Sequence, residues 1–420
     1  MGKRWLDRYG VVVSVALLAA VVALVIFTAK TTQEHPEAKS IAAQAPLTSS
    51  GTEVFASADG ELRGMWVPYF SLDMSRENDK SEAAFQQKFD TIIENSKAYE
   101  MNALIVQVRP FADAFYPSKL FPWSGYLTGT QGTDPGYDPL AYMVQSAHKA
   151  GMQLHVWINP LRIQVHDVPQ TMADSNPYVL WQKDSEKQDW CLPWAESEGV
   201  YFNAGIPEVR QYIADGVREI VENYAIDGVQ FDDYFYPTED SAFDKETYQS
   251  YCDSLAEGKT KLSQQEWRRA NISSLVSLVY TTIHSIDDSV QFGIAPQGNV
   301  ENDLAIGADV AAWCSTSGYV DYICPQLYYN FENPTLPYDT AAKQWRAMVT
   351  NPDVRLYFGL GVYKAASDAD GGTWKKENKI LSQQVRLGRT IGCDGFLFYS
   401  YDSFQREEAK EEIENVLKVL

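Results

Sequence analysis

Cysteine and histidine are scarce in this sequence. Its 420 residues include five cysteines, with no CxxC or CxxH arrangement, and five histidines, with no His-x-His pair. An odd number of scattered cysteines argues against both a disulfide framework and a structural zinc site. The histidines are too few and too dispersed for zinc-dependent hydrolysis. We therefore expect no metal and no cofactor, with a calcium or magnesium site on paired aspartates as the alternative.

Two motifs of common enzyme classes are also missing. The chain has no Gly-x-Ser-x-Gly elbow, which argues against a Ser-His-Asp hydrolase. No glycine-rich turn follows the first strand-like segment, so nothing in the sequence is suited to hold a dinucleotide.

Positive charge is in short supply, whereas aromatic residues are plentiful. Only 35 Lys and Arg stand against 56 Asp and Glu, which gives a formal net charge of −21. This charge repels phosphate backbones, so we expect no nucleic acid partner. Aromatic residues make up 13% of the chain, with 11 Trp and 25 Tyr. Their flat, half-polar faces suit sugar rings, and a large hydrophobic core is the alternative explanation.

One long hydrophobic run stands near the amino terminus. Lys3, Arg4 and Arg8 precede residues 10–29, which carry no charge. About twenty helical residues cross a hydrocarbon core of roughly 30 Å, and a positive flank stays in the cytoplasm. We predict a basic cytoplasmic tail at 1–9 and a single transmembrane anchor in the lipid bilayer at 10–29, with the rest extracellular or facing the cell wall. A cleaved signal peptide is the alternative, although its apolar part is usually shorter.

The remainder of the chain divides into a linker and a folded domain. Residues 30–60 are rich in Ala, Ser, Thr, Gln and Glu and contain almost no large apolar side chain. Such a segment cannot bury enough surface to order itself, so we predict a disordered linker. The folded domain is expected at 61–420.

Short apolar runs alternate with longer amphipathic runs throughout 61–420. The predicted strands are 62–70, 103–110, 152–160, 228–236, 290–296, 319–328, 355–363 and 395–402. The predicted helices are 82–99, 139–150, 207–224, 264–286, 306–315, 340–349, 374–389 and 405–420. Near-continuous apolar strands are typical of a parallel sheet buried on both faces. Eight such units predict an α/β fold, a (β/α)8 TIM barrel with long βα loops at 111–137, 161–206 and 237–264, and an open doubly wound sheet is the alternative.

Polar residues at the carboxyl ends of these strands are the candidates for the active site, because that is where such barrels carry it. Side chains alternate along a strand, so Gln107 and Arg109 should share one face, as should His155, Trp157 and Asn159. The candidates for substrate binding, at strand ends and in the aromatic-rich loops, are Arg109, Trp123, Asn159, Arg162, Tyr234, Gln326 and Tyr328. A hydrogen-bonded plug that closes the mouth of the barrel is the alternative.

The strongest local signal is the segment DGVQFDDY at 227–234, in which Asp232 and Asp233 are adjacent at a strand end. Neighbouring strand residues point to opposite faces, so one carboxylate should enter the mouth while the other turns toward a neighbouring strand or loop. Like charges this close raise a pKa, as a general acid needs near neutral pH. A helix N-cap and a salt-bridged loop residue are the alternative roles. Asp227, at the other end of the strand, is expected to be structural.

Glycoside hydrolysis normally requires a second carboxyl group. The two groups lie about 5–5.5 Å apart for retention of configuration and roughly 6.5–9.5 Å apart for inversion. Asp113, Glu332 and Asp402 all follow strand ends and remain open as candidates. We favour Asp113, because its loop starts directly at the mouth, so the predicted catalytic residues are Asp113, Asp232 and Asp233.

Several ordered motifs resemble one known family. They are LRGMWV at 62–67, VQVRPFADAFY at 106–116, PWSGYLTG at 122–129, DPGYDPL at 134–140, WINPLR at 157–162, DDYFYP at 232–237, WRRAN at 267–271, FGIAP at 292–296 and PQLY at 325–328. Together they resemble the bacterial glycosyl-hydrolase-like family 10, over essentially all of residues 61–405. The resemblance implies an exported (β/α)8 glycosidase acting on the glycan strands of peptidoglycan after their peptides are removed. It also implies that Arg109, Asp113, Asn159, Arg162, Asp232, Asp233, Tyr234, Arg268 and Gln326 lie in or around the site.

Two other functions fit the same features. A barrel without catalytic activity could use the groove to bind cell-wall glycan, and a metal-dependent polysaccharide deacetylase is a weaker alternative. All three functions make a polysaccharide the partner of the folded domain.

Overall fold

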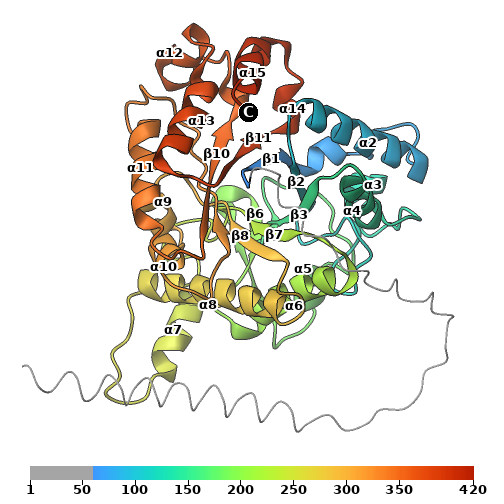
Figure 1. Ribbon diagram of the computed structural model, residues 1–420. Helices are drawn as coiled ribbons and strands as arrows, with labels where there is room; N and C mark the ends of the chain where they lie inside the picture. The colour runs from blue at the N-terminus through green and yellow to red at the C-terminus, as the bar shows by residue number, and fades with distance from the viewer. Residues whose placement is uncertain (1–59) are drawn as a thin grey trace, which may run out of the picture. The chain divides into compact units, whose positions relative to one another are not determined.

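The computed structural model describes residues 60–420 of the chain (Figure 1). The predicted basic tail, the predicted anchor at 10–29 and the linker as far as residue 59 lie outside these residues. Between residues 60 and 420, no helix has the length and apolar character needed to cross a membrane.

Eight parallel strands form a closed barrel. They are β1 (Leu62–Val67), β2 (Ala103–Arg109), β3 (Gln153–Ile158), β7 (Gly228–Phe231), β8 (Gln291–Ile294), β9 (Tyr322–Ile323), β10 (Arg355–Gly361) and β11 (Gly395–Tyr399). Their order around the barrel is β1-β11-β10-β9-β8-β7-β3-β2, and closure comes from β1, which pairs with both β2 and β11. All eight strands fall within the predicted segments, so the predicted barrel is confirmed and the open sheet is excluded.

Helices surround the strands on the outside of the barrel (Figure 1). The longer ones are α2 (Glu82–Ala98), α4 (Pro139–Lys149), α6 (Pro207–Asn223), α7 (Lys245–Ser254), α8 (Gln264–His284), α11 (Tyr338–Met348) and α13 (Ile380–Ile391). The shorter ones are α3 (Gly125–Thr128), α5 (Pro177–Trp181), α9 (Val300–Ala305), α10 (Val310–Ser315), α12 (Ala369–Lys376), α14 (Tyr401–Phe404) and α15 (Lys410–Leu417). Local sequence explains their starts: the Asp138 carboxylate accepts from Ala141 N at 3.1 Å before α4, and Ser263 and Glu266 form a capping box at α8.

The apolar side chains form two separate cores. The larger core fills the space between the strands and the helices. The smaller core lies inside the barrel and includes Trp66, Trp157, Tyr322 and Leu397, with Tyr399 packed against it. Inside this core Trp66 Nε1 donates to Gln230 Oε1 at 2.6 Å, so the buried polar atoms are paired within the barrel. The barrel is therefore a packed cylinder, and only its mouth is free for chemistry.

The chain departs from the predicted elements in several places. The predicted loop 161–206 contains an antiparallel sheet of β4 (Arg162–Gln164), β6 (Gly199–Phe202) and β5 (Cys191–Trp194), in that order. The single helix predicted at 374–389 is instead two helices, α12 and α13, and Asp370, Gly371 and Gly372 near the start of α12 have positive φ. The predicted helix 405–420 is likewise shorter, with α15 beginning at Lys410.

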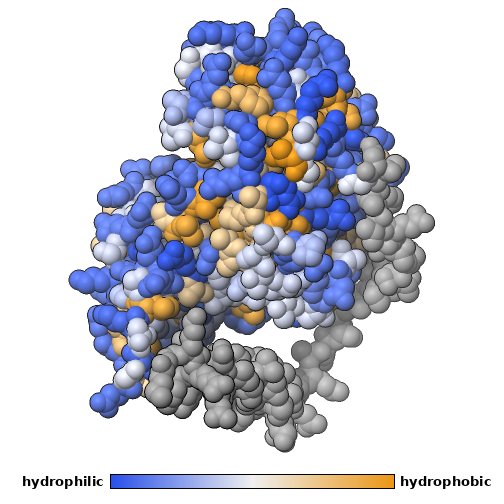
Figure 2. All heavy atoms as spheres, turned by 60° about the vertical axis from the view of Figure 1, so that its left-hand side comes forward, coloured by the Kyte–Doolittle hydropathy of each residue, from blue (hydrophilic) through white to orange (hydrophobic). Residues whose placement is uncertain are grey.

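The surface on the side of α11 is mostly hydrophilic (Figure 2). Hydrophobic residues show between the hydrophilic ones as separate patches rather than as one continuous face. Large exposed hydrophobic side chains include Phe70, Tyr234 and Tyr363, which follow β1, β7 and β10 respectively. Aromatic surface is thus placed at the carboxyl ends of these three strands.

Candidate active site

Asp232 is the first polar residue after β7, and it is held by donors on three sides. Its Oδ2 accepts from Trp157 Nε1 at 3.2 Å and from Asn159 Nδ2, and its Oδ1 accepts from the Tyr234 backbone N–H at 3.2 Å. Trp157 is the second-last residue of β3, and its ring belongs to the core inside the barrel. Asp232 therefore turns into the barrel mouth, toward the neighbouring strand β3, and only 3% of it is exposed.

Asp233 turns the other way, as alternation along β7 requires. Its Oδ1 accepts from Gln326 Nε2 at 2.7 Å, and Gln326 also donates to Ala295 O at 2.9 Å. Gln326 follows β9 and pairs with Gln297, which follows β8. The carboxyl of Asp233 is thus fixed by the ends of the strands on the opposite side of β7, and it is more exposed than Asp232.

Burial raises the pKa of both carboxyl groups. The pKa of Asp232 rises to about 7, chiefly through burial and then through the adjacent Asp233, while Arg162 and the donors from Tyr234 and Trp157 act to lower it. Burial also raises the pKa of Asp233, against the lowering effect of Gln326. Two carboxyl groups this close titrate as a pair, and the pair retains a proton near neutral pH. That is the property required of a general acid.

Arg162 connects the two aspartates to a third carboxyl group. Its guanidinium lies over the rings of Phe111 at 4.7 Å and Tyr234 at 5.3 Å, and its Nε donates to Pro110 O at 2.9 Å. It is close enough to lower the pKa of Asp113 as well as those of Asp232 and Asp233. The two aromatic faces fix the guanidinium in place, so one cation serves three acids.

Asp113 is the third acid, in the loop after β2. Burial raises its pKa to about 6, against hydrogen bonds from Ser124 and Gln131 and the charge of Arg162. Its Oδ2 accepts from Gln131 Nε2 at 3.4 Å, whereas its Oδ1 is buried without a partner. Asp113 is therefore a buried acid with one oxygen that lacks a hydrogen bond, and the charge of Arg162 acts on it.

Other predicted residues join this cluster through the strands. Asn159 accepts from Gln107 Nε2 at 2.6 Å, and Gln107 Oε1 accepts from the Tyr69 backbone N–H at 3.1 Å. Tyr328 packs against the core inside the barrel, with its ring 5.9 Å from that of Tyr399 and 5.7 Å from that of Tyr363. Trp157, Asn159, Arg162, Tyr234, Gln326 and Tyr328 are therefore brought to the same end of the barrel as the aspartate pair.

Arg109 is a correction to the sequence analysis, which placed it at the mouth beside Gln107. The register of β2 shifts between Gln107 and Arg109, so the alternation that put both on one face is broken. The Arg109 guanidinium lies 4.5 Å from the Phe121 ring and against Gly216 of α6, and the residue is only 2% exposed. It belongs to the layer between barrel and helices and is not in a position to bind substrate.

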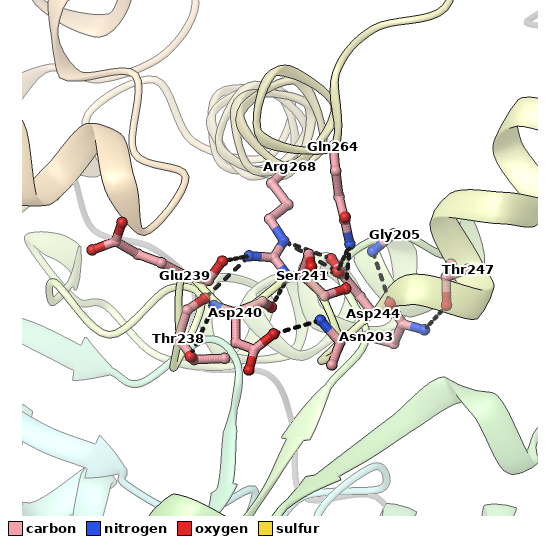
Figure 3. A network of polar contacts seen from close by, with 11 residues as sticks. Asn203, Gly205, Thr238, Glu239, Asp240, Ser241, Asp244, Thr247, Gln264 and Arg268 are labelled. Carbon is pink, nitrogen blue, oxygen red and sulfur yellow. Dashed lines mark hydrogen bonds and ion pairs between the residues drawn. The ribbon is translucent and has the colours of Figure 1, made fainter.

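Arg268 is a second correction, because all its donors are engaged within the protein (Figure 3). Its Nε donates to both oxygens of Asp244 at 3.1 and 2.9 Å, and its Nη2 donates to Asp244 Oδ1 at 2.6 Å and to Asp240 O at 2.7 Å. Its Nη1 donates to the carbonyl oxygens of Thr238 and Glu239, each at 3.2 Å. With no N–H free for a sugar, Arg268 instead fixes the loop between β7 and α7 to α8.

Trp123 and the structural aspartate complete the predicted set. Trp123 lines a separate hollow on the side of the barrel, together with residues of α4 and α6. Asp227 accepts from His148 Nε2 and from the Leu154 backbone N–H, each at 2.8 Å, which confirms its expected structural role. Of the other acids considered, Asp402 accepts from Ser71 Oγ. In the described part of the chain, no group of three or more His, Cys, Asp and Glu side chains is arranged to hold a metal.

The comparison with protein families shows which family this chain belongs to. The model of the family described as glycosyl hydrolase-like 10 matches residues 61–374. The chain belongs to this family. The predicted family is thereby confirmed, and with it the expectation that the chain is a glycosidase.

Curated proteins similar to this member of the glycosyl hydrolase-like 10 family carry related names. Glycosyl hydrolase YngK of Bacillus subtilis (strain 168) is 34% identical over 358 residues, which cover 80% of this chain and 67% of that protein. Glycosyl hydrolase DigH of Escherichia coli (strain K12) is 35% identical over 320 residues, which cover 71% of this chain and 70% of that protein.

Solved structures support the fold of the family member independently. The glycoside hydrolase domain of PgaB (BpsB) from Bordetella bronchiseptica superposes with a TM-score of 0.55 at 14% identity, covering 85% of this chain and 99% of that domain. The catalytic domain of beta-amylase from Paenibacillus polymyxa gives a TM-score of 0.54 at 14% identity, covering 87% and 99%. Both likenesses concern the barrel fold alone.

Two further residues hold the site, beyond the predicted catalytic and substrate-binding residues. Gln107 positions Asn159, and Gln297 contributes a hydrogen bond that lowers the pKa of Asp233. Gln297 is in turn fixed by Asp303, a fully buried residue whose Oδ1 accepts from the Gln297 backbone N–H at 2.9 Å. Gln107 is the third-last residue of β2 and Gln297 lies three residues after β8, so their signal in the sequence is a polar residue near the carboxyl end of a strand.

Proposed function

We propose that this glycosidase cleaves the glycan strands of the bacterial cell wall, using the Asp232–Asp233 pair as general acid and Asp113 as the second carboxyl group. The observation that carries the proposal is the adjacent aspartate pair at the end of β7, in which the pKa of Asp232 is raised to about 7. The charge of Arg162 acts on both members of this pair and also on Asp113. The choice of wall glycan rests on the family resemblance of the motifs and on the export signal predicted from residues 1–29.

The chemistry follows from the protonation of the pair. At neutral pH the pair holds a proton, and Asp233, as the more exposed member, is the one to deliver it to the leaving oxygen of a glycosidic bond. The donors from Trp157, Asn159 and Tyr234 stabilise the negative charge of Asp232, and Gln326 Nε2 stabilises the charge that forms on Asp233 when its proton leaves. Asp113, ionised beside Arg162, acts on the other side of the bond, either on the sugar or on a water.

Substituting the acids tests this mechanism. Asp232→Asn, Asp233→Asn and Asp113→Asn each keep the shape of the side chain, and each should lower the rate of glycan cleavage by about 10²–10⁴-fold while binding survives. The measurement is the release of new reducing ends from peptide-stripped cell wall by the fragment 60–420. Glu332→Gln, an exposed-loop acid of the same face, is the control and should keep full activity. Turnover retained in both pair variants would refute the role of the pair.

A barrel that binds glycan without cleaving it is the second candidate, because the aromatic residues at the mouth serve binding as well as cleavage. In that case the parent protein binds the strands and releases no reducing ends, and the three Asn variants bind as the parent does.

The proposed membrane anchor has a separate test. The full chain should sediment with membranes, and the fragment 60–420 should stay in the supernatant.

A further inference from the structure

One hollow on the outside of the barrel lies on its side, away from the mouth. It has a volume of about 990 Å³ and is lined by three segments, 117–123, 134–141 and 215–224, from the loop after β2, from the start of α4 and from α6. We call it the flank groove. Its size falls within the range of about 300–1,000 Å³ that is usual for small-molecule sites.

The walls of the flank groove are fixed by specific hydrogen bonds. The Glu219 carboxylate of α6 accepts from Ser118 Oγ at 2.5 Å and from the Lys119 backbone N–H at 2.7 Å. On the other side, Tyr224 OH donates to Asp138 Oδ2 at 2.8 Å, which ties α6 to the start of α4. The groove is therefore a preformed concavity and not a gap between loosely packed elements.

Trp123 supplies an aromatic face in this concavity. It is half-buried and lines the groove, and its backbone is fixed because Ala114 N donates to Pro122 O at 2.9 Å and Ser124 N donates to Ala114 O at 2.8 Å. A half-exposed tryptophan in a hollow offers a flat apolar surface of the kind that the apolar face of a sugar ring can cover.

The polar groups around Trp123 suit hydroxyl groups. Arg218 approaches Asp215 at 3.9 Å and Glu222 at 3.8 Å, which are ion-pair distances too long for hydrogen bonds. Asp215 Oδ1 accepts from Gln211 Nε2 at 2.8 Å, whereas the Arg218 guanidinium and the Glu222 carboxylate face the groove as a donor and an acceptor for hydroxyl groups.

Charge decides which ligand class the groove admits. The acids that line it are Asp134, Asp138, Asp215, Glu219 and Glu222, and the bases are Lys119 and Arg218. This excess of negative charge disfavours phosphates, carboxylates and sulfates, so among sugars the groove favours neutral rings over acidic ones.

We propose that the flank groove is a second carbohydrate-binding site, which holds neutral sugar rings against Trp123 outside the catalytic mouth. The two sites share one loop, because Ala114, next to Asp113, pairs with Trp123. A long glycan held in the flank groove would stay attached to the enzyme between cleavage events at the mouth. This role rests on the proposed function, whereas binding in the groove does not.

Binding is tested in the fragment 60–420 carrying Asp232→Asn, so that cleavage does not interfere. The probes are the tetrasaccharides of N-acetylglucosamine and of cellulose, with tetragalacturonate as the anionic comparison, measured by calorimetry. Trp123→Ala should weaken binding of the neutral probes at least fivefold, and tetragalacturonate should bind at least tenfold more weakly than they do. Trp194→Ala is the matched control, because Trp194 is also half-buried but packs on Phe243 elsewhere.

Substitutions at surface positions provide a second test of binding in case Trp123→Ala does not fold. The double variant Arg218→Ala, Glu222→Gln removes the polar groups without touching the core and should also weaken neutral binding at least fivefold. Glu208→Gln, at the first turn of the same helix, should leave it unchanged. Unaltered binding in both Trp123→Ala and the double variant overturns the proposal, as does equal binding of the anionic probe.

A cleavage assay separates this proposal from the proposed function. With an active mouth, the double variant should cleave short peptide-stripped fragments at the parent rate and long strands at least threefold more slowly. If the parent cleaves no glycan but binds the neutral probes through Trp123, the sugar-binding role of the flank groove is supported and the proposed function is refuted. If cleavage is intact and no variant alters binding or the rate on long strands, the groove fails and the proposed function stands.

Discussion

At the scale of single residues, the site depends on how a few buried side chains share charge. Asp232 is surrounded by three donors, yet its pKa lies near 7 because burial and the neighbouring Asp233 outweigh them. Arg162 is held between two rings and lowers the pKa of every acid in the cluster. The site thus holds a proton at neutral pH and is also prepared for the anion that forms when the proton leaves.

The first prediction at this scale concerns the pH dependence of cleavage. The aspartate pair must hold its proton in the free enzyme, so kcat/KM should fall as pH rises above about 7, the value to which the pKa of Asp232 in this pair is raised. Arg162→Gln removes the cation that lowers this pKa, and the alkaline limb should therefore move to higher pH. The measurement is kcat/KM for glycan cleavage between pH 4 and 9. An alkaline limb that does not move in Arg162→Gln would contradict the assigned electrostatics.

The sequence identified the acids correctly as neighbours in space but misjudged two cations. Asp232, Asp233 and Asp113 are brought within reach of Arg162, as strand-end position suggested. Arg109 was misplaced because one register shift in β2 cannot be read from alternation. Arg268 was included by resemblance alone, and its partner Asp244 lies in a loop whose path no periodicity predicts.

At the scale of elements, loops and helices are fastened to the barrel by single buried groups. The loop between β7 and α7 begins with the aspartate pair and is fixed to α8 by Arg268 (Figure 3). Loss of the Arg268 hydrogen bonds should therefore displace the backbone that carries the catalytic pair.

The order of the elements was predictable from the alternation of apolar runs. The extra sheet of β4, β6 and β5 was not, because its strands are only three or four residues long.

The second prediction concerns the Arg268 hydrogen bonds. Arg268→Ala leaves Asp244 buried without its cation, so the free energy of unfolding should fall by about 3–5 kcal/mol. Arg268→Lys should recover little of this loss, because an ammonium cannot supply the forked set of donors. Chemical denaturation of the fragment 60–420 measures both. Lys343→Ala, which breaks an exposed pair with Asp339, is the control and should cost less than about 1 kcal/mol.

The third prediction concerns the packing of α6 on the barrel. Gly216 lies inside this helix, where glycine to alanine normally stabilises by about 1 kcal/mol. A Cβ at this position would meet Arg109 and approach the Phe121 ring to 2.6 Å, so Gly216→Ala should instead lower the melting temperature. Gln211→Ala, at an exposed position of the same helix, is the comparison and should leave the melting temperature nearly unchanged. A rise in melting temperature for Gly216→Ala would show that Arg109 is not packed there.

At the scale of the whole molecule, buried acids set how stability depends on pH. Burial raises the pKa of Asp113 to about 6, of Asp232 to about 7 and of Glu412 to about 7, and that of Asp303 well above its ordinary value. Each group binds its proton more tightly in the folded state than in the unfolded state. Their stabilising contribution is therefore complete below about pH 4 and is lost as pH rises toward 7.

The fourth prediction isolates one of these groups away from the active site. Glu412 accepts from the Leu381 backbone N–H at 2.5 Å, and its other oxygen is buried without a partner. Glu412→Gln cannot ionise, so the melting temperature of the variant relative to the parent should rise between pH 4.5 and 7.5. Thermal unfolding at both pH values measures this difference. Glu411→Gln, at the neighbouring exposed position, is the control. Its melting temperature relative to the parent should be the same at both pH values.

The pairing of β1 with β11, which closes the barrel, has a consequence for how the chain folds. Leu62, the first residue of β1, pairs with Gly395, the first residue of β11, so the opening residues of the domain find their second neighbour only among its last. A partly synthesised chain therefore has an unsatisfied strand edge at both ends and cannot complete the cylinder. The barrel therefore cannot close until β11, close to the carboxyl end of the chain, has been synthesised.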